Sequence, residues 1–271
     1  MSISRSTTMR IIIGMLLLVF AISCLWLPPL LFMLLIQLLS AGLAYEFSRA
    51  KFPNSAITLR VGAAISSAAI VAIVAIIYQE IHEFILILLL GIVIIVLMAL
   101  ATTAKNTHKN NLFWAIFGVL YSSILPAHLL LIKNLDHQFG FLLVLLITVV
   151  ATDSGAYFIG KSMGRHKLWE SISPNKTWEG ALGGLLVGSI LPFLSMQIIS
   201  SFDYSIFEMT IIAVLLSTST IVGDLFESAL KRKIGIKDFS NILLEHGGLL
   251  DRVDSLIFTG MIFFWIHRLI S

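Results

Sequence analysis

Five carboxylates stand near the ends of apolar segments in the C-terminal half of the chain: Asp153, Asp224, Glu227, Asp251 and Asp254. Asp224 and Glu227 are three residues apart, as are Asp251 and Asp254, so each pair lies on one face of a helix. Two acidic faces that pack together repel each other unless a cation lies between them. Mg²⁺ binds one or two carboxylates together with substrate phosphates. The spacing therefore predicts a magnesium site.

Basic residues alternate with these acids. Lys231, Arg232, Lys233 and Lys237 follow the first pair, and Arg252 lies within the second. Phosphoryl and nucleotidyl transfer require a metal, positive charge and alignment, so cations among metal-type carboxylates predict a bound polyphosphate. Two simpler interpretations stay open: the acids could only form ion pairs with these cations, and the cations could anchor the chain to the inner leaflet.

A glycine pair precedes the second acidic face. His246 is followed by Gly247 and Gly248, and a helix is expected to begin near Leu249. Paired glycines let backbone N–H groups approach an anion closely, and a helix N-terminus adds positive potential. The motif predicts a phosphate contact, to which His246 could donate; a plain turn is the alternative.

A second polar loop contains Ser173, Pro174, Lys176 and Thr177. Pro174 requires an extended backbone before it, and Thr177 is predicted to cap the helix that follows. Ser173, Lys176 and Thr177 would then present donors to a phosphate at a helix N-terminus. The alternative is a capped turn with one lysine that only sets topology.

The elements that position these residues are membrane helices. The chain has 271 residues, of which 58% are hydrophobic and 12% charged, and its mean hydropathy is +0.98. A soluble domain carries about 25% charged residues, so a water-soluble enzyme, a disordered chain and a coiled coil are excluded. About 20 apolar residues span a bilayer. We predict an all-α polytopic membrane protein with about nine spans, at residues 9–26, 28–47, 57–78, 82–102, 112–132, 138–158, 180–200, 206–228 and 249–270.

Charge sets the expected orientation. With the N-terminus in the cytoplasm, sixteen Lys and Arg residues lie inside, and only Lys133 and Arg268 lie outside. The net charge of +3 is therefore attributed to topology, and no nucleic-acid partner is expected. We predict N-terminal hydrophobic helices in residues 1–100 and a catalytic membrane domain in 101–271, with cytoplasmic loops at 159–179 and 229–248. Glycines at 180, 184 and 188 predict close helix packing.

The polar motifs together resemble one known family. Ser228, Lys231, Arg232, Lys237 and Asp238 have the spacing S-x-x-K-R-x4-K-D, and residues 246–255 read H-G-G-x-x-D-R-x-D-S. Residues 153–157, 173–180 and 223–228 agree as well. This pattern, over about 150–256, resembles the phosphatidate cytidylyltransferase (CDP-diacylglycerol synthase) family. The sequence departs at Leu244 and Glu245, where the family has small residues.

The resemblance implies a reaction and a site. It implies that CTP and phosphatidate give CDP-diacylglycerol and pyrophosphate for phospholipid synthesis. It also implies a homodimeric enzyme in a bacterial-type inner (plasma) membrane, with its active site on the cytoplasmic side. The enzyme is expected to require Mg²⁺ and can use K⁺ in addition. Asp224 and Asp251 become metal ligands, with Asp254 and Asp153 as further candidates. The remaining catalytic candidates are Lys231, Arg232, Arg252 and His246; the substrate-binding candidates are Ser173, Lys176, Thr177, Ser228, Lys237, Asp238, Gly247 and Gly248.

Two other functions are compatible with parts of this pattern. A related CTP-dependent kinase of a membrane lipid or polyprenol would bind the same nucleotide and metal, but it would release CDP instead of pyrophosphate. A lipid transporter would place acids across the depth of the membrane. Here the acids cluster on one side, which favours the enzyme.

Overall fold

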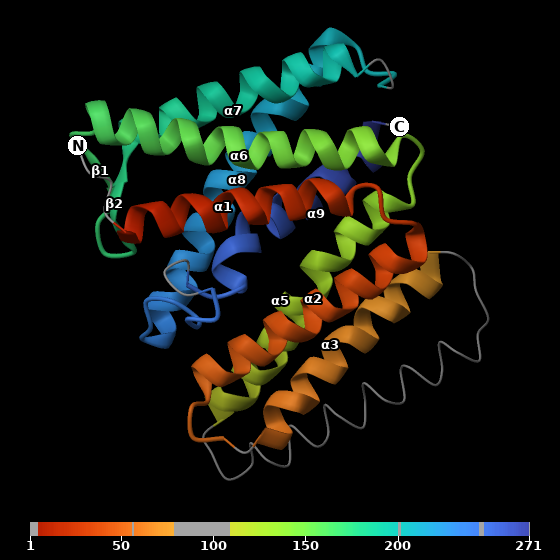
Figure 1. Ribbon diagram of the computed structural model, residues 1–271, viewed down its shortest axis with the longest axis vertical. Helices are drawn as coiled ribbons and strands as arrows, with labels where there is room; N and C mark the ends of the chain where they lie inside the picture. Colours follow the sequence, from red (N-terminus) through yellow and green to blue (C-terminus); the bar gives the residue numbers. More distant parts are fainter. Residues whose placement is uncertain (1–4, 56, 79–108, 200–201, 244–246, 271) are drawn as a thin grey trace. The chain divides into compact units, whose positions relative to one another are not determined.

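The computed structural model describes residues 5–55, 57–78, 109–199, 202–243 and 247–270. Figure 1 shows the elements that these residues form, and the label α4 is not used. The helices are α1 (Arg5–Cys24), α2 (Pro29–Lys51), α3 (Ile57–Tyr78), α5 (Lys109–Lys133), α6 (Gln138–Met163), α7 (Trp178–Ile198), α8 (Ile206–Ile234) and α9 (Leu250–Ile270). Two short strands, β1 (Lys167–Trp169) and β2 (Ser173–Thr177), lie between α6 and α7.

Seven helices of the described ranges are long and apolar enough to cross a membrane. They are α2, α3 and α5 to α9, and they confirm the predicted all-α polytopic membrane protein. The expected span at 82–102 lies outside the described residues. The total of nine spans and the cytoplasmic N-terminus stay predictions.

Two helices extend further into the polar loops than hydropathy predicts. α6 continues to Met163, where Gly164 follows, and α8 continues to Ile234. Gly235 ends α8 with φ 85°, and its N–H donates to the carbonyls of Lys231 and Arg232. Glycine adopts this left-handed conformation without the strain of a Cβ, so it is a common helix terminator.

The chain forms two compact units. The first comprises residues 1–131 with 238–252, and the second comprises 132–237 with 253–271. The predicted domain boundary at residue 100 falls outside the described residues, and the predicted domains stay predictions.

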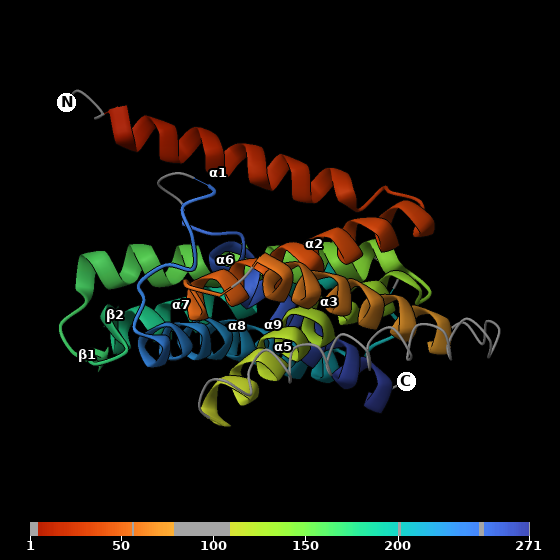
Figure 2. The same ribbon diagram turned by 90° about the horizontal axis from the view of Figure 1, so that it is seen from below.

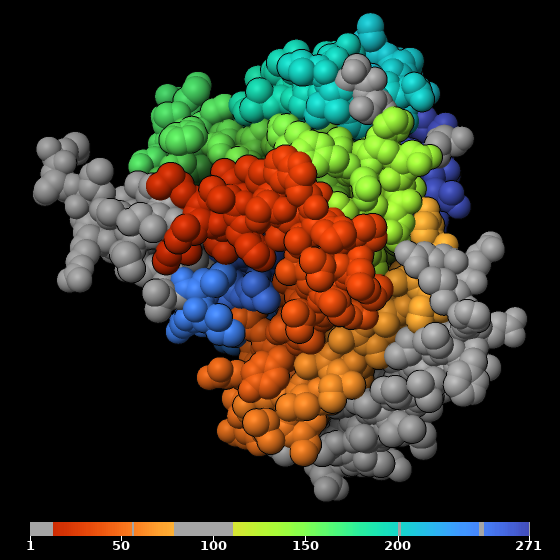
Figure 3. Space-filling model, turned by 45° about the vertical axis from the view of Figure 1, so that its right-hand side comes forward, coloured from red at the N-terminus to blue at the C-terminus, as the bar shows by residue number. Residues whose placement is uncertain are grey.

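In the first unit, α2 packs beside α3, as the neighbouring orange surfaces in Figure 3 show. Ala44, Leu59, Ala63 and Val119 form a buried cluster at these helices and α5. Nearby, the buried ring of Phe47 contacts several other aromatic rings: Trp114, Phe117 and Phe239. Aromatic pairs of this kind add to the stabilisation that burial provides.

In the second unit, α6 and α7 lie side by side, as the views in Figures 1 and 2 agree. A Cβ at Gly184 would lie 2.8 Å from the carbonyl oxygen of Thr152, so the helix backbones approach too closely for a larger residue. This confirms the predicted packing role of the small residues in α7. The antiparallel strands β1 and β2 connect the two helices, with Lys167 opposite Thr177 and Trp169 opposite Ser173.

Candidate active site

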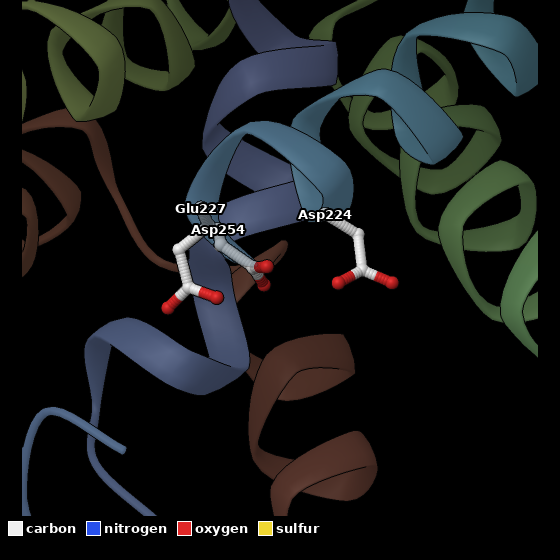
Figure 4. Close-up of side chains that lie close together, drawn as sticks. All are labelled: Asp224, Glu227 and Asp254. Atoms are coloured by element: carbon white, nitrogen blue, oxygen red, sulfur yellow. The ribbon is translucent and has the colours of Figure 1, made fainter. Parts of the chain in front are cut away.

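Three carboxylates from two helices meet in the second unit. Asp224 and Glu227 come from α8 and Asp254 from α9, and one oxygen of each lies within 4.8 Å of the others. Figure 4 shows that the three groups gather on one side of α8. Glu227 and Asp254 are buried, with exposed fractions of 1% and 7%, whereas Asp224 is half-buried. The i, i+3 spacing therefore does place Asp224 and Glu227 together.

Two lysines contact this cluster. The Nζ of Lys231 lies 2.6 Å from Oε2 of Glu227, one turn along α8. The Nζ of Lys176, from β2, lies 2.6 Å from Oδ2 of Asp224. Two ammonium groups face three carboxylates, so the cluster keeps an excess of negative charge if all five groups are ionised.

The cluster suits a metal ion. Its donors are all carboxylate oxygens, which hard divalent cations prefer. Burial makes repulsion among carboxylates costly because the surrounding dielectric constant is low. Asp224 leaves the cluster open to solvent, since 37% of its side chain is exposed. The residues present therefore fit a cation that also contacts a solvent-borne ligand.

A cavity of about 610 Å³ borders the cluster through Asp224. Asp153, Tyr157 and Lys161 of α6 line it, and the strand β2 contributes Ser173, Asn175, Lys176 and Thr177. A pocket of this volume accommodates a ligand of several hundred daltons. Polar and charged groups at its wall make it suitable for a charged ligand. Asp153, a predicted ligand, thus lines this cavity and is not one of the three clustered carboxylates.

The start of α7 holds β2 at the edge of the cavity. Thr177 caps this helix because its side chain accepts a hydrogen bond from the N–H of Gly180 at 3.1 Å, which confirms the predicted cap. Glu179 accepts hydrogen bonds from the backbone N–H groups of Arg165 and His166 and from Nδ1 of His166. These contacts fix both ends of the hairpin and so restrict where Lys176 can lie.

Arg232 has a structural contact in addition to its predicted role. Its Nε donates to the carbonyl of Ile172 at 3.2 Å, and its Nη1 donates to the carbonyl of Ile236 at the same distance. The guanidinium thereby ties the β1–β2 turn to the end of α8. Ser228 is half-buried on α8, and Lys237 is exposed beyond the end of this helix.

Asp251 belongs to the first unit, together with Asp238, Gly247 and Gly248. Its Oδ2 accepts hydrogen bonds from the N–H of Gly248 at 2.8 Å and from the N–H of Phe239 at 3.0 Å. The N–H of Gly248 is thus bound by a side chain of the same chain. The role of Asp251 as a metal ligand and the phosphate contacts of the glycines stay predictions.

The structure also identifies residues to which the sequence interpretation gave no such role. Glu227 belongs to the cluster although it was not among the predicted ligands, and its spacing from Asp224 was the available signal. Glu46 on α2, to which the sequence gave no site role, has a buried side chain. Arg252 is exposed at the start of α9. His246 and the departure at Leu244 and Glu245 lie outside the described residues.

Comparison with known proteins gives one consistent result. A sequence model described as "Cytidylyltransferase family" matches residues 8–270. The phosphatidate cytidylyltransferase of Bacillus subtilis (strain 168) is 38% identical over 178 residues, which cover 65% of this chain and 65% of that protein. The phosphatidate cytidylyltransferase of Aquifex aeolicus (strain VF5) is 36% identical over 170 residues, which cover 63% of this chain and 62% of that protein.

A protein of the same name from Staphylococcus epidermidis (strain ATCC 35984) is 34% identical over 194 residues, which cover 70% of this chain and 74% of the relative. The matches to the Bacillus and Aquifex proteins span slightly less than two thirds of those relatives.

Proposed function

The chain belongs to the cytidylyltransferase family, and from this premise we propose that it transfers the cytidylyl group of CTP to phosphatidate. The products are CDP-diacylglycerol and pyrophosphate, which places the reaction in phospholipid synthesis. The observation that carries the proposal is the carboxylate cluster of Asp224, Glu227 and Asp254 at the edge of a polar cavity.

The proposed transfer does not require a covalent intermediate with the protein. A phosphate oxygen of phosphatidate forms a bond to the α-phosphorus of CTP, while the bond from that phosphorus to the bridging oxygen breaks and pyrophosphate leaves. The nucleophile is already an anion, so a strong general base is not required. Catalysis then depends on alignment and on compensation of negative charge.

Several side chains are suited to these two tasks. Lys176 lies at the cavity wall and can release Asp224 to contact a triphosphate oxygen. Lys161 adds a second cation at the same wall, and Ser173 adds a hydroxyl donor. Lys231 offsets the charge of Glu227, so this buried carboxylate keeps a defined orientation.

We assign the cluster to Mg²⁺, with Asp224, Glu227 and Asp254 as the residues that would hold it. When bound, the ion supplies positive charge that draws the triphosphate oxygens together and stabilises the leaving pyrophosphate. Asp251 and Asp153 remain further proposed ligands. We also propose K⁺ as a second cation, which the family resemblance supports.

We also propose a location and an oligomeric state for the protein. The apolar helices and the bias of Lys and Arg support an inner (plasma) membrane protein whose site faces the cytoplasm. The likeness to the family supports a homodimer. Phosphatidate then reaches the protein within its own leaflet, and CTP reaches it from the water phase.

Product identification tests the proposal. Purified protein in mixed micelles receives phosphatidate and CTP labelled in the α-phosphate, with Mg²⁺ or with excess EDTA. We expect labelled CDP-diacylglycerol and an equal amount of pyrophosphate with Mg²⁺, and no product with EDTA. Formation of CDP with transfer of the γ-phosphate would indicate a lipid kinase instead. In vesicles that contain the protein, movement of lipid between the leaflets without consumption of CTP would indicate a transporter.

A further inference from the structure

Glu46 is a buried carboxylate for which the reaction proposed above provides no role. It lies near the C-terminal end of α2, and only 1% of its surface is exposed. Burial of a carboxylate costs several kcal/mol unless it is paired and hydrogen-bonded. A compensating set of donors must therefore surround it.

Those donors come from the segment that leads into α9. Oε1 of Glu46 accepts hydrogen bonds from the hydroxyl of Ser240 and from the N–H of Leu249, the latter at 3.0 Å. Oε2 accepts a hydrogen bond from the N–H of Leu250 at 2.7 Å. Since α9 begins at Leu250, both oxygens cap its N-terminus, where the helix dipole favours negative charge. One side chain thus joins α2 to Ser240 and to the N-terminus of α9.

The close approach depends on Gly248. A Cβ on this residue would overlap the carboxylate of Glu46. The N–H of Gly248 donates to Asp251 at 2.8 Å, so this glycine lies between two carboxylates of the same unit. The paired glycines therefore have a packing function that does not require a bound anion.

A second set of contacts involves the described residues beside these donors. Phe239 is buried and stacks on Phe47, the residue after Glu46, with 5.7 Å between ring centroids. The N–H of Phe239 donates to Asp251, and the N–H of Leu243 donates to the carbonyl of Gly247 at 3.0 Å. Asp251 is thus connected to α2 through Phe239, which stacks on Phe47.

We infer that Glu46 is a positioning residue, which holds Ser240, the N-terminus of α9 and the Asp251 carboxylate in the geometry that the reaction uses. This inference rests on the proposed cytidylyltransferase function and on the predicted role of Asp251 in it. Glu46 acts through the backbone of Leu249 and Leu250 and does not contact the substrates. Loss of a residue that orients a metal-binding or catalytic group costs about 10- to 100-fold in activity.

The test compares Glu46→Gln with the wild-type protein in the full-length chain. Glutamine keeps the shape of the side chain but has only one acceptor oxygen, so the N–H of either Leu249 or Leu250 loses its partner. We expect kcat to fall by about 10- to 100-fold and the Mg²⁺ concentration for half-maximal rate to rise. A simple loss of folded protein would lower the apparent kcat but would leave the Mg²⁺ dependence unchanged.

Hydrogen exchange supplies a readout that needs no activity. We expect amides 248–250 to exchange about tenfold faster in Glu46→Gln, while amides in α6 keep their wild-type rates. Glu208→Gln is the matched control, because Glu208 also caps a helix, in a capping box with Ser205 at the start of α8. This control should leave kcat, the Mg²⁺ dependence and the exchange of 248–250 unchanged.

A double-mutant cycle adds a test of the mechanism. Gly248→Ala should displace the Glu46 carboxylate and so reproduce the Glu46→Gln effects, and the double variant should be no worse than the more impaired single variant. Additive losses would overturn the inference, as would wild-type kcat in Glu46→Gln or faster exchange throughout the protein. The proposed function fails if the wild-type protein makes no CDP-diacylglycerol. The positioning role is refuted separately if amides 248–250 exchange at the wild-type rate in Glu46→Gln.

Discussion

Replacement of Asp224 by Asn should separate catalysis from stability. The side chains of Asp224 and Lys176 are 37% and 26% exposed, so their ion pair is only partly desolvated. Pairs of this exposure contribute about 0–1 kcal/mol to stability. If Asp224 holds a metal ion and the reacting phosphates, its loss should reduce turnover by at least about 100-fold, which corresponds to about 2.7 kcal/mol in the activation free energy.

Replacement of Glu227 by Gln, three residues later, should reduce stability as well as turnover. Glu227 is 1% exposed, and its partner Lys231 has a side chain that is 13% exposed. Glu227→Gln breaks this buried ion pair, which should cost up to about 3–5 kcal/mol of stability, and the relief of repulsion between Glu227 and Asp254 should offset part of that cost. We therefore expect Asp224→Asn to be inactive with a nearly normal unfolding free energy, and Glu227→Gln to be both inactive and destabilised.

Three measurements on the same preparations check this contrast. Turnover is followed with labelled CTP, unfolding is followed by denaturant titration in mixed micelles, and cation binding is followed by the electron paramagnetic resonance of Mn²⁺ without nucleotide. Asp203→Asn serves as the control, because this exposed acid lies in the loop between α7 and α8. Near wild-type turnover and Mn²⁺ binding in Asp224→Asn would refute the assignment of this carboxylate, and a stability loss of several kcal/mol would show that its pair with Lys176 is mainly structural.

Two further predictions concern other parts of the second unit. Thr177→Val removes the cap of α7 and should lower the unfolding free energy by about 1 kcal/mol, as measured by denaturant titration. Thr177→Ser keeps the hydroxyl and should keep the wild-type unfolding free energy. Equal stability of the two variants would contradict the role of the hydroxyl. Burial, with a smaller contribution from the charge of Glu208, raises the pKa of Tyr204 to about 12. The unfolded chain has a tyrosine pKa of about 10, so the folded state loses stability as the pH rises from about 10 to about 12. The unfolding free energy of Tyr204→Phe should fall less over this pH interval than that of the wild-type protein, again by denaturant titration. An unchanged pH dependence would contradict the attribution of this loss to Tyr204.

The membrane helices could be predicted well because hydropathy reports the lipid environment directly. The span expected at 57–78 coincides with α3, and the span expected at 206–228 begins where α8 begins. Helix ends were less predictable because the hydrogen-bond ladder does not stop where the apolar residues stop. α8 continues through Lys231 and Arg232 until Gly235 ends it, and this glycine was the signal that hydropathy alone missed.

The polar parts of the structure were predicted unevenly for a similar reason. The strands β1 and β2 have three and five residues, and β2 contains Pro174, so neither has the alternating pattern of a strand. The cap at Thr177 depends on local sequence and was predicted correctly. The bonds of Glu46 join residues about 200 positions apart, and no local pattern contains that information.

The length of α8 has a consequence for the proposed lipid substrate. Its 29 residues extend over about 44 Å at a rise of about 1.5 Å per residue, whereas the hydrocarbon layer is about 30 Å thick. Asp224 lies eighteen residues, or about 27 Å, beyond Ile206, so a helix that enters a hydrocarbon layer of about 30 Å at Ile206 brings this residue close to the head groups on the other side. A two-tailed phospholipid could therefore react without leaving its leaflet, and the protein avoids the cost of about 0.8 kcal/mol for each methylene drawn into water.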